Sequence, residues 1–188
     1  MKQTTTRTRN EIIFGGFGGQ GIITAGYITG KASAVYDGKD STLTRVYGPE
    51  ARGSACRSSV VIEEEKVSYP YVQEPEIMII MSKDAYEKYL SRLNEGGTLI
   101  VDSSLVSLDE RAEKYKVYKV PATQIAEDMG VRIIANVIML GFLSEIWKGV
   151  SVEAMRKSVK DTVPQKYVEL NVKAFEKGVE LAKEAKKA

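Results

Sequence analysis

The stretch EIIFGGFGGQGIITAG, residues 11–26, contains the strongest indication of the fold. It begins with a short apolar run over residues 11–14, which predicts a buried strand, and continues into glycines with the spacing G-x-G-x-x-G. From Ile22 to Val35, apolar side chains recur mostly at helical intervals. The stretch therefore predicts a strand, a tight glycine turn and a helix, which is the opening of an α/β fold.

The rest of the chain continues this alternation. Strands are predicted at residues 41–47, 58–63, 76–81, 98–102 and 115–120, and helices at residues 84–93, 121–129, 131–147 and 168–182. The run 76–81 is apolar almost throughout, as in a parallel strand covered on both faces. The segment 131–147 is apolar on nearly every side, which predicts a helix in the core or at an interface.

These elements predict one α/β domain over residues 11–188, preceded by a flexible tail over residues 1–10. We expect three layers, α/β/α, around a mainly parallel, Rossmann-like sheet. The net charge of +2 is spread along the chain, which argues against a nucleic-acid partner. No apolar run approaches the ~20 residues that span a bilayer, so we expect no membrane partner and a cytoplasmic protein.

The cysteine and histidine content limits the chemistry. The chain contains one cysteine, Cys56, and no histidine. One cysteine cannot hold an iron–sulfur cluster alone, and without histidine the usual zinc sites and the Ser-His and Cys-His dyads are excluded within this chain. Cys56 is predicted to be an inert small residue, because no histidine can activate it. We predict no metal site in this chain, and the sequence identifies no catalytic residue.

The glycine turn has two interpretations. Backbone amides at a helix N-terminus stabilise a phosphate, but glycines in such a turn also serve packing alone. A dinucleotide-binding site would also have an acidic residue about 20 residues later, at the end of the second strand. Here Asp37 and Asp40 precede that strand, which weakens the NAD interpretation. The candidate cofactor contacts in the turn are Gly16, Gly18, Gly19, Gln20 and Gly21.

A second loop, YGPEARGSACR at residues 47–57, combines one carboxylate, Glu50, with the guanidinium groups of Arg52 and Arg57. A solvated turn with Glu50 and Arg52 paired on the surface would contribute only about 0–1 kcal/mol to stability. The functional alternative is an anion-facing loop, in which Arg52 and Arg57 bind a carboxylate or phosphate. Taken alone, the loop favours the solvated turn.

Together, four motifs resemble the gamma subunit of 2-oxoacid:ferredoxin oxidoreductases. They are FGGFGGQG at residues 14–21, YGPEARG at 47–53, NVIMLG at 136–141, and VPQKY at 163–167 followed by Asn171 and AFEKG at 174–178. The second motif, followed by CRS and a VVI strand, is most similar to the branch acting on 2-oxoglutarate, whereas the pyruvate branch usually has FGPERRG. Ser54 departs from the pattern, because a second glycine is common there.

The resemblance implies one subunit of an enzyme that converts a 2-oxoacid and coenzyme A to an acyl-CoA and CO₂ while ferredoxin receives two electrons. It implies thiamine diphosphate, Mg²⁺ and iron–sulfur clusters on partner subunits, with alpha and beta chains as partners and a delta chain as a further candidate. We expect the glycine turn, with Glu50, Arg52 and Arg57, to contact the phosphate end of coenzyme A; the alternative is that both loops only form contacts with partner subunits. A stand-alone NAD-type oxidoreductase and a non-catalytic assembly module stay open as alternatives.

Overall fold

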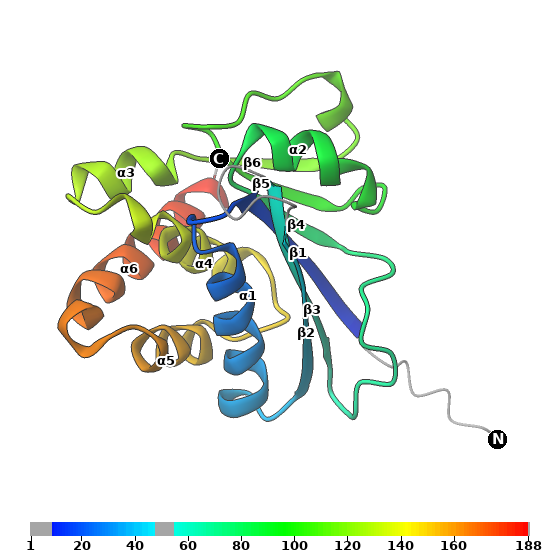
Figure 1. Cartoon of the computed structure of the whole chain (residues 1–188), viewed down its shortest axis with the longest axis horizontal. Coiled ribbons are helices and arrows are strands. Elements are labelled where there is room, and N and C mark those ends of the chain that lie inside the picture. Colours follow the sequence, from blue (N-terminus) through cyan, green and yellow to red (C-terminus); the bar gives the residue numbers. More distant parts are fainter. Residues whose placement is uncertain (1–8, 48–54, 188) are drawn as a thin grey trace.

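The structure is a computed structural model, and it describes residues 9–47 and 55–187. Within these residues, a six-stranded sheet with the order β2-β3-β1-β4-β5-β6 has helices on both faces (Figure 1). The strands are β1 (Arg9–Phe17), β2 (Asp40–Val46), β3 (Ala55–Glu63), β4 (Ile77–Ile80), β5 (Thr98–Asp102) and β6 (Lys116–Val120). The predicted alternation of strands and helices therefore builds one sheet.

Strand directions confirm the mainly parallel sheet. β1, β4, β5 and β6 pair in parallel, whereas β3 pairs antiparallel with both β1 and β2. β2 consequently has the same direction as β1, and β3 is the one reversed strand among those described. β4 lies between β1 and β5 with all four residues buried, as its apolar run predicts.

The helices are distributed unequally over the two faces. They are α1 (Ile22–Lys31), α2 (Lys83–Tyr89), α3 (Ala122–Asp128), α4 (Ala135–Ile146), α5 (Val152–Thr162) and α6 (Val168–Ala185). In the described chain, α2 lies on one face of the sheet, and the other helices lie on the opposite face (Figure 1). The three predicted layers are present, with one thick and one thin outer layer.

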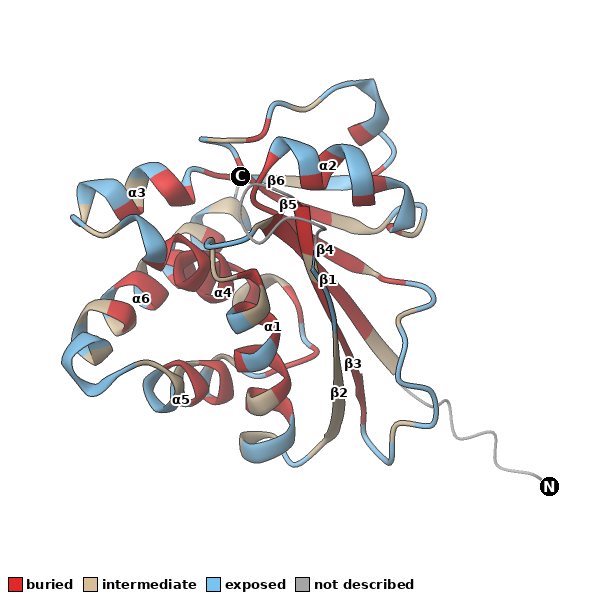
Figure 2. Cartoon of the chain, in the orientation of Figure 1, coloured by how far each residue is buried: buried red, intermediate tan, exposed pale blue. Residues whose placement is uncertain are grey.

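Successive side chains of each strand point to opposite faces of the sheet, so the hydrophobic core has two parts. In β4, Ile77 and Ile79 face the core under α1, α4 and α6, and Met78 and Ile80 face the core under α2. Figure 2 shows buried residues throughout the centre of the sheet and on the sides of the helices that face it. Each central strand thus contributes to both cores, which explains its continuous apolar sequence.

Helix α4 is the central helix of the thick layer. All ten residues from 135 to 144 are buried, which confirms the prediction of a core helix. It begins at Ala135 rather than Val131, because a 3-10 turn, Arg132–Ile134, precedes it. It packs closely on α6: a Cβ on Gly141 would lie 2.0 Å from the carbonyl oxygen of Phe175, and one on Gly178 would lie 2.0 Å from that of Ile138.

The first strand is longer than its apolar run predicts. β1 begins at Arg9, so Arg9 and Asn10 do not belong to the predicted tail. The Arg9 guanidinium lies 2.8 Å from the buried carboxylate of Glu63 and 2.5 Å from that of Glu11. These ion pairs fix the start of β1 against β3, an effect that hydrophobic periodicity does not detect.

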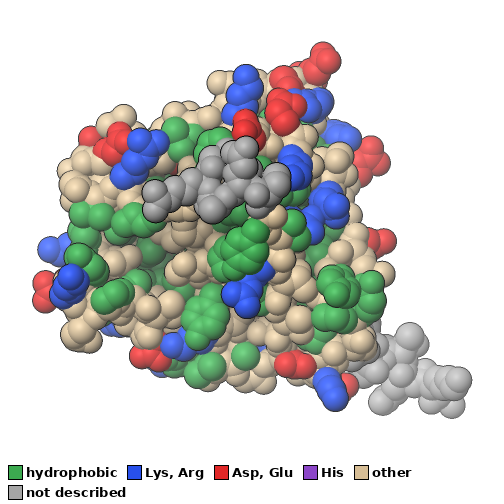
Figure 3. Space-filling view, viewed as in Figure 1, with side chains coloured by type: hydrophobic (Ala, Val, Ile, Leu, Met, Phe, Trp, Pro, Cys, Tyr) green, Lys and Arg blue, Asp and Glu red, His purple; other side chains and the backbone are tan. Residues whose placement is uncertain are grey.

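The surface carries mixed charge. On the face in Figure 3, lysine and arginine side chains alternate with acidic ones around separate groups of exposed hydrophobic residues. Among the helices of the described residues, none is long and apolar enough to cross a membrane.

Candidate functional site

The glycine turn between β1 and α1 is held by the side chain of Gln20. Its amide oxygen accepts a hydrogen bond from the N–H of Phe17 at 2.6 Å, and its amide nitrogen donates to the carbonyl oxygen of Met81 at 2.7 Å. Gly19 and Gly21 have φ values of 99° and 73°, which glycine adopts without steric cost. Gln20 therefore ties the turn to the end of β4, and both polar atoms of its side chain are used within the protein.

Gly16 lies in β1, opposite Cys56 of β3, and not in the turn, which comprises residues 18–21. A Cβ on Gly16 would lie 2.6 Å from both Gln20 Oε1 and Ile22 Cδ1. The structure thus gives Gly16 a packing function, since only a residue without a side chain lets the turn fold back onto the strand.

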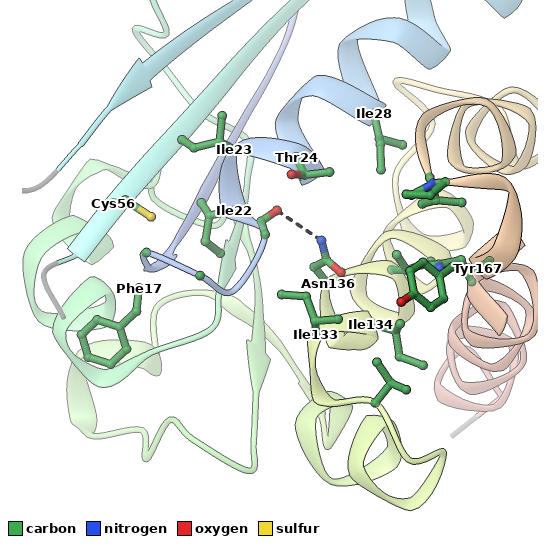
Figure 4. A pocket seen from close by; sticks show the side chains of 18 of the residues that line it. Phe17, Ile22, Ile23, Thr24, Ile28, Cys56, Ile133, Ile134, Asn136 and Tyr167 are labelled. Carbon is green, nitrogen blue, oxygen red and sulfur yellow. Dashed lines mark hydrogen bonds between the residues drawn. The ribbon is translucent and has the colours of Figure 1, made fainter. Parts of the chain in front are cut away.

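A pocket of about 770 Å³ lies beside the turn (Figure 4). The glycine turn and α1 form one side, and the start of α4 and the segment leading into α6, which carries Tyr167, form the other. Its walls are mainly aliphatic, with Ile22, Ile28 and Leu170 among them, and none of the described residues that line it is charged. The described lining therefore suits an uncharged, largely apolar part of a ligand.

The start of α1 adds hydrogen-bond donors to this apolar pocket. Ile22, Ile23 and Thr24 line the pocket and form the first turn of the helix. Within the described residues, no side chain caps this end, and the first turn contains no acidic residue. Their N–H groups, combined with the positive end of the helix dipole, provide a place for an anionic group.

Three sequence motifs meet at this pocket. Asn136, the first residue of NVIMLG, donates from Nδ2 to the carbonyl oxygen of Gly21 at 3.2 Å, the contact dashed in Figure 4. A Cβ on Gly21 would lie 2.2 Å from the same nitrogen, so this position of the Asn136 side chain requires a glycine at residue 21. Asn171 also lines the pocket and donates to the carbonyl oxygen of Tyr167 at 2.9 Å.

The second loop begins and ends beside the same pocket. Tyr47 and Cys56, on either side of residues 48–54, both line it. Cys56 is 4% exposed, and burial raises the pKa of its thiol, which favours the unreactive protonated form. Glu50 and Arg52 lie outside the described residues, and their assignment as ligand contacts stays a prediction.

Arg57 lies on the opposite face of the sheet. Adjacent residues of a strand point to opposite faces, so Cys56 faces the pocket and Arg57 faces the thin layer, with its guanidinium 5.4 Å from the ring centroid of Tyr89. The side chain of Arg57 therefore does not line the pocket beside the glycine turn. Sequence reasoning also assigned no site function to Asn136, although its motif was part of the resemblance.

The chain is similar to known proteins over nearly its whole length. The family model described as pyruvate ferredoxin/flavodoxin oxidoreductase matches residues 11–181. The chain is 46% identical to the 2-oxoglutarate synthase subunit KorC of Methanocaldococcus jannaschii, over 98% of this chain and 100% of that protein. It is 45% identical to the KorC of Methanothermobacter thermautotrophicus, over 94% of this chain and 96% of that protein.

Solved structures agree with these matches. The gamma subunit of a keto/oxoacid ferredoxin oxidoreductase from Geobacter sulfurreducens is 39% identical, with a TM-score of 0.82 over 92% of this chain and 98% of that one. The 2-oxoglutarate:ferredoxin oxidoreductase of Magnetococcus marinus, with 2-oxoglutarate, coenzyme A and succinyl-CoA bound, is 26% identical, with a TM-score of 0.85 over 93% of this chain and 31% of that one. The resemblance seen in the four motifs is confirmed, and the chain belongs to the pyruvate ferredoxin/flavodoxin oxidoreductase family.

Proposed function

We propose that this chain is the gamma subunit of a heteromeric oxidoreductase that acts on 2-oxoglutarate. The enzyme would convert 2-oxoglutarate and coenzyme A to succinyl-CoA and CO₂ and transfer two electrons to ferredoxin. The supporting observation is that three KorC subunits are 44–46% identical to the chain, whereas two pyruvate synthase subunits named PorC are 33–34% identical. A KorC from Archaeoglobus fulgidus is 31% identical, so the substrate rests on the first three.

The composition supports a division of labour between subunits. With one cysteine and no histidine, this chain does not fit an iron–sulfur cluster. We therefore place the clusters, and thiamine diphosphate with Mg²⁺, on the alpha and beta subunits, with a delta subunit as a further candidate. Thiamine diphosphate would supply the carbanion chemistry and the clusters would pass single electrons to ferredoxin. We assign the complex to the cytoplasm, since its cluster-bearing partners need reduced thiols.

Coenzyme A is the ligand that we propose for the pocket beside the glycine turn. It combines an extended, largely uncharged pantetheine arm with phosphate groups. The aliphatic walls suit the arm, and the N–H groups of Ile22, Ile23 and Thr24, which no side chain of the described residues caps, suit one anionic group. Glu50 and Arg52 stay candidates for further contacts, because residues on both sides of their loop line the pocket. Arg57 is not part of this proposal.

The test is anaerobic purification of the complex through this chain, followed by viologen reduction with 2-oxoglutarate, pyruvate and 2-oxoisovalerate. We expect co-purifying chains that contain iron and thiamine diphosphate, and coenzyme A-dependent reduction that is fastest with 2-oxoglutarate. Faster reduction with another acid would contradict the substrate assignment. A chain that purifies alone with a bound dinucleotide would instead support the stand-alone oxidoreductase.

A further inference from the structure

A second pocket, of about 540 Å³, lies on the opposite face of the sheet from the coenzyme A pocket. Its floor contains Arg57 and Ser59 of β3 and Thr44 of β2, and one wall is the turn after α2, with Ser91 and Arg92. The residues that line it are mainly polar, in contrast to the aliphatic first pocket. The sheet separates this pocket from the glycine turn, so a ligand bound at the turn does not account for its polar lining.

Arg57 has an unsatisfied donor in this pocket. Its guanidinium stacks on Tyr89, and its Nε is buried without a hydrogen-bond partner among the described residues. Burial lowers the pKa of Arg57, and the like charge of Arg92 lowers it further. A buried donor without a partner destabilises the folded state, and more so when the group is charged. Arg57 therefore carries a charge next to that of Arg92 and has a buried donor that no described residue satisfies.

Four of the five other arginines among the described residues differ from this pair, and the fifth, Arg45, is exposed and likewise has no ion pair there. Arg9, Arg111, Arg132 and Arg156 each lie within 4 Å of a carboxylate oxygen. None of the ion pairs in residues 9–47 and 55–187 involves Arg57 or Arg92. Glu95, which also lines the pocket, is exposed and pairs with neither of them. Among the described residues, no carboxylate therefore forms an ion pair with either guanidinium group of this pocket.

We propose that this pocket binds a phosphate group between Arg57 and Arg92. The pocket offers more hydrogen-bond donors than one carboxylate can accept: two guanidinium groups and the hydroxyls of Thr44, Ser59 and Ser91. A tetrahedral oxyanion such as phosphate can accept more of these hydrogen bonds than a carboxylate can. The volume also admits a small molecule that carries the phosphate. The site is independent of the coenzyme A pocket, so either assignment can fail alone.

Calorimetric titration of the full chain tests this site with inorganic phosphate and with glycerol 3-phosphate, against chloride at equal ionic strength. We expect saturable binding of at least one phosphate probe, and at least tenfold weaker binding after Arg57→Met or Arg92→Gln. Arg57→Met keeps an apolar stem over Tyr89, and Arg57→Lys, which restores charge without the fork, should bind with intermediate affinity. Comparing the two probes distinguishes free phosphate from a phosphomonoester.

Arg132→Gln is the matched control, because Arg132 is exposed and pairs with Glu127 away from this pocket. It should leave the affinity unchanged. Arg92 is exposed as well, so Arg92→Gln should fold normally even if Arg57→Met does not. The proposal is overturned if neither probe saturates the wild-type chain, if Arg92→Gln binds as wild type, or if succinate binds more tightly than both phosphate probes.

Discussion

At the scale of single residues, Gln20 connects two strands through one side chain. Its hydrogen bonds to Phe17 and Met81 are part-buried, so the Gln20→Ala variant leaves a donor and an acceptor without partners. We expect a loss of about 1–3 kcal/mol in the free energy of unfolding, measured by urea denaturation. Gln124→Ala, at an exposed position in α3, is the control and should change stability by less than about 0.5 kcal/mol. Equal stability of both variants would contradict this function of Gln20.

Glu76 provides a pH-dependent prediction. Burial raises the pKa of its carboxyl, the hydrogen bond from the indole N–H of Trp147 opposes that shift, and the nearby Glu11 adds to it. Because the folded state holds this proton to a higher pH than the unfolded state, Glu76 lowers stability as pH rises above its unfolded pKa. Glu76→Gln keeps an oxygen for Trp147 and removes the half-buried charge.

The variant should therefore unfold at a higher temperature than wild type at pH 7.5, and the difference should disappear near pH 4. Thermal unfolding followed by circular dichroism at both pH values measures this. Glu74→Gln, at an exposed neighbouring position, should show no such dependence. A variant less stable than wild type at pH 7.5 would mean that the charged hydrogen bond to Trp147 outweighs desolvation.

At the scale of elements, the contact between α4 and α6 depends on glycine. Gly178→Ala would place a Cβ 2.0 Å from the carbonyl oxygen of Ile138, so the helices must separate. We expect a loss of about 3 kcal/mol or more in the free energy of unfolding. The control is Gly30→Ala in α1, where the nearest atom would lie 3.5 Å away, and it should stabilise the chain by about 0.5–1 kcal/mol. Similar effects of the two changes would contradict the close packing.

Hydrophobic periodicity predicted most helices and strands, and it missed segments that capping or ion pairs stabilise. The amphipathic pattern that closes the chain predicted α6, and the apolar run over Ile77–Ile80 predicted β4. No helix was predicted at Val152–Thr162, because few of its residues are apolar; Ser151 caps it by accepting from the N–H of Ala154. The N-terminal extension of β1 depends on the ion pairs of Arg9, which have no periodic signal.

At the scale of the whole molecule, the coenzyme A assignment predicts a kinetic effect in the assembled enzyme. Ile133 lines the pocket and is 52% exposed, so Ile133→Asp should fold normally while placing a charge beside the ligand. We expect the KM for coenzyme A to rise about tenfold, a change of about 1.4 kcal/mol, with little change in the KM for the 2-oxoacid.

Val35→Asp provides the matched comparison. Val35 is 63% exposed and follows α1 outside the pocket. This variant should have the wild-type KM for coenzyme A. If Ile133→Asp also has the wild-type value, coenzyme A does not occupy this pocket, whatever the substrate of the complex.

The site was predictable only in part. Glycine spacing indicated the turn, and the four ordered motifs indicated the family. The hydrogen bond from Asn136 to Gly21 joins residues 115 positions apart, and a single sequence carries no signal for such a contact. The face of the sheet on which Arg57 lies could not be predicted, because it depends on where β3 begins, and the glycines and the proline of the preceding loop do not specify that position.

The glycine contacts between α4 and α6 also limit how the molecule moves. Because backbone touches backbone at Gly141 and Gly178, the two helices cannot slide or separate without losing their packing, and they behave as one rigid unit. Asn136 and Asn171 belong to that unit. If the pocket beside the glycine turn closes around a ligand, the displacement must therefore come from the glycine turn and α1 or from the turn at Arg132–Ile134, while the far wall stays fixed.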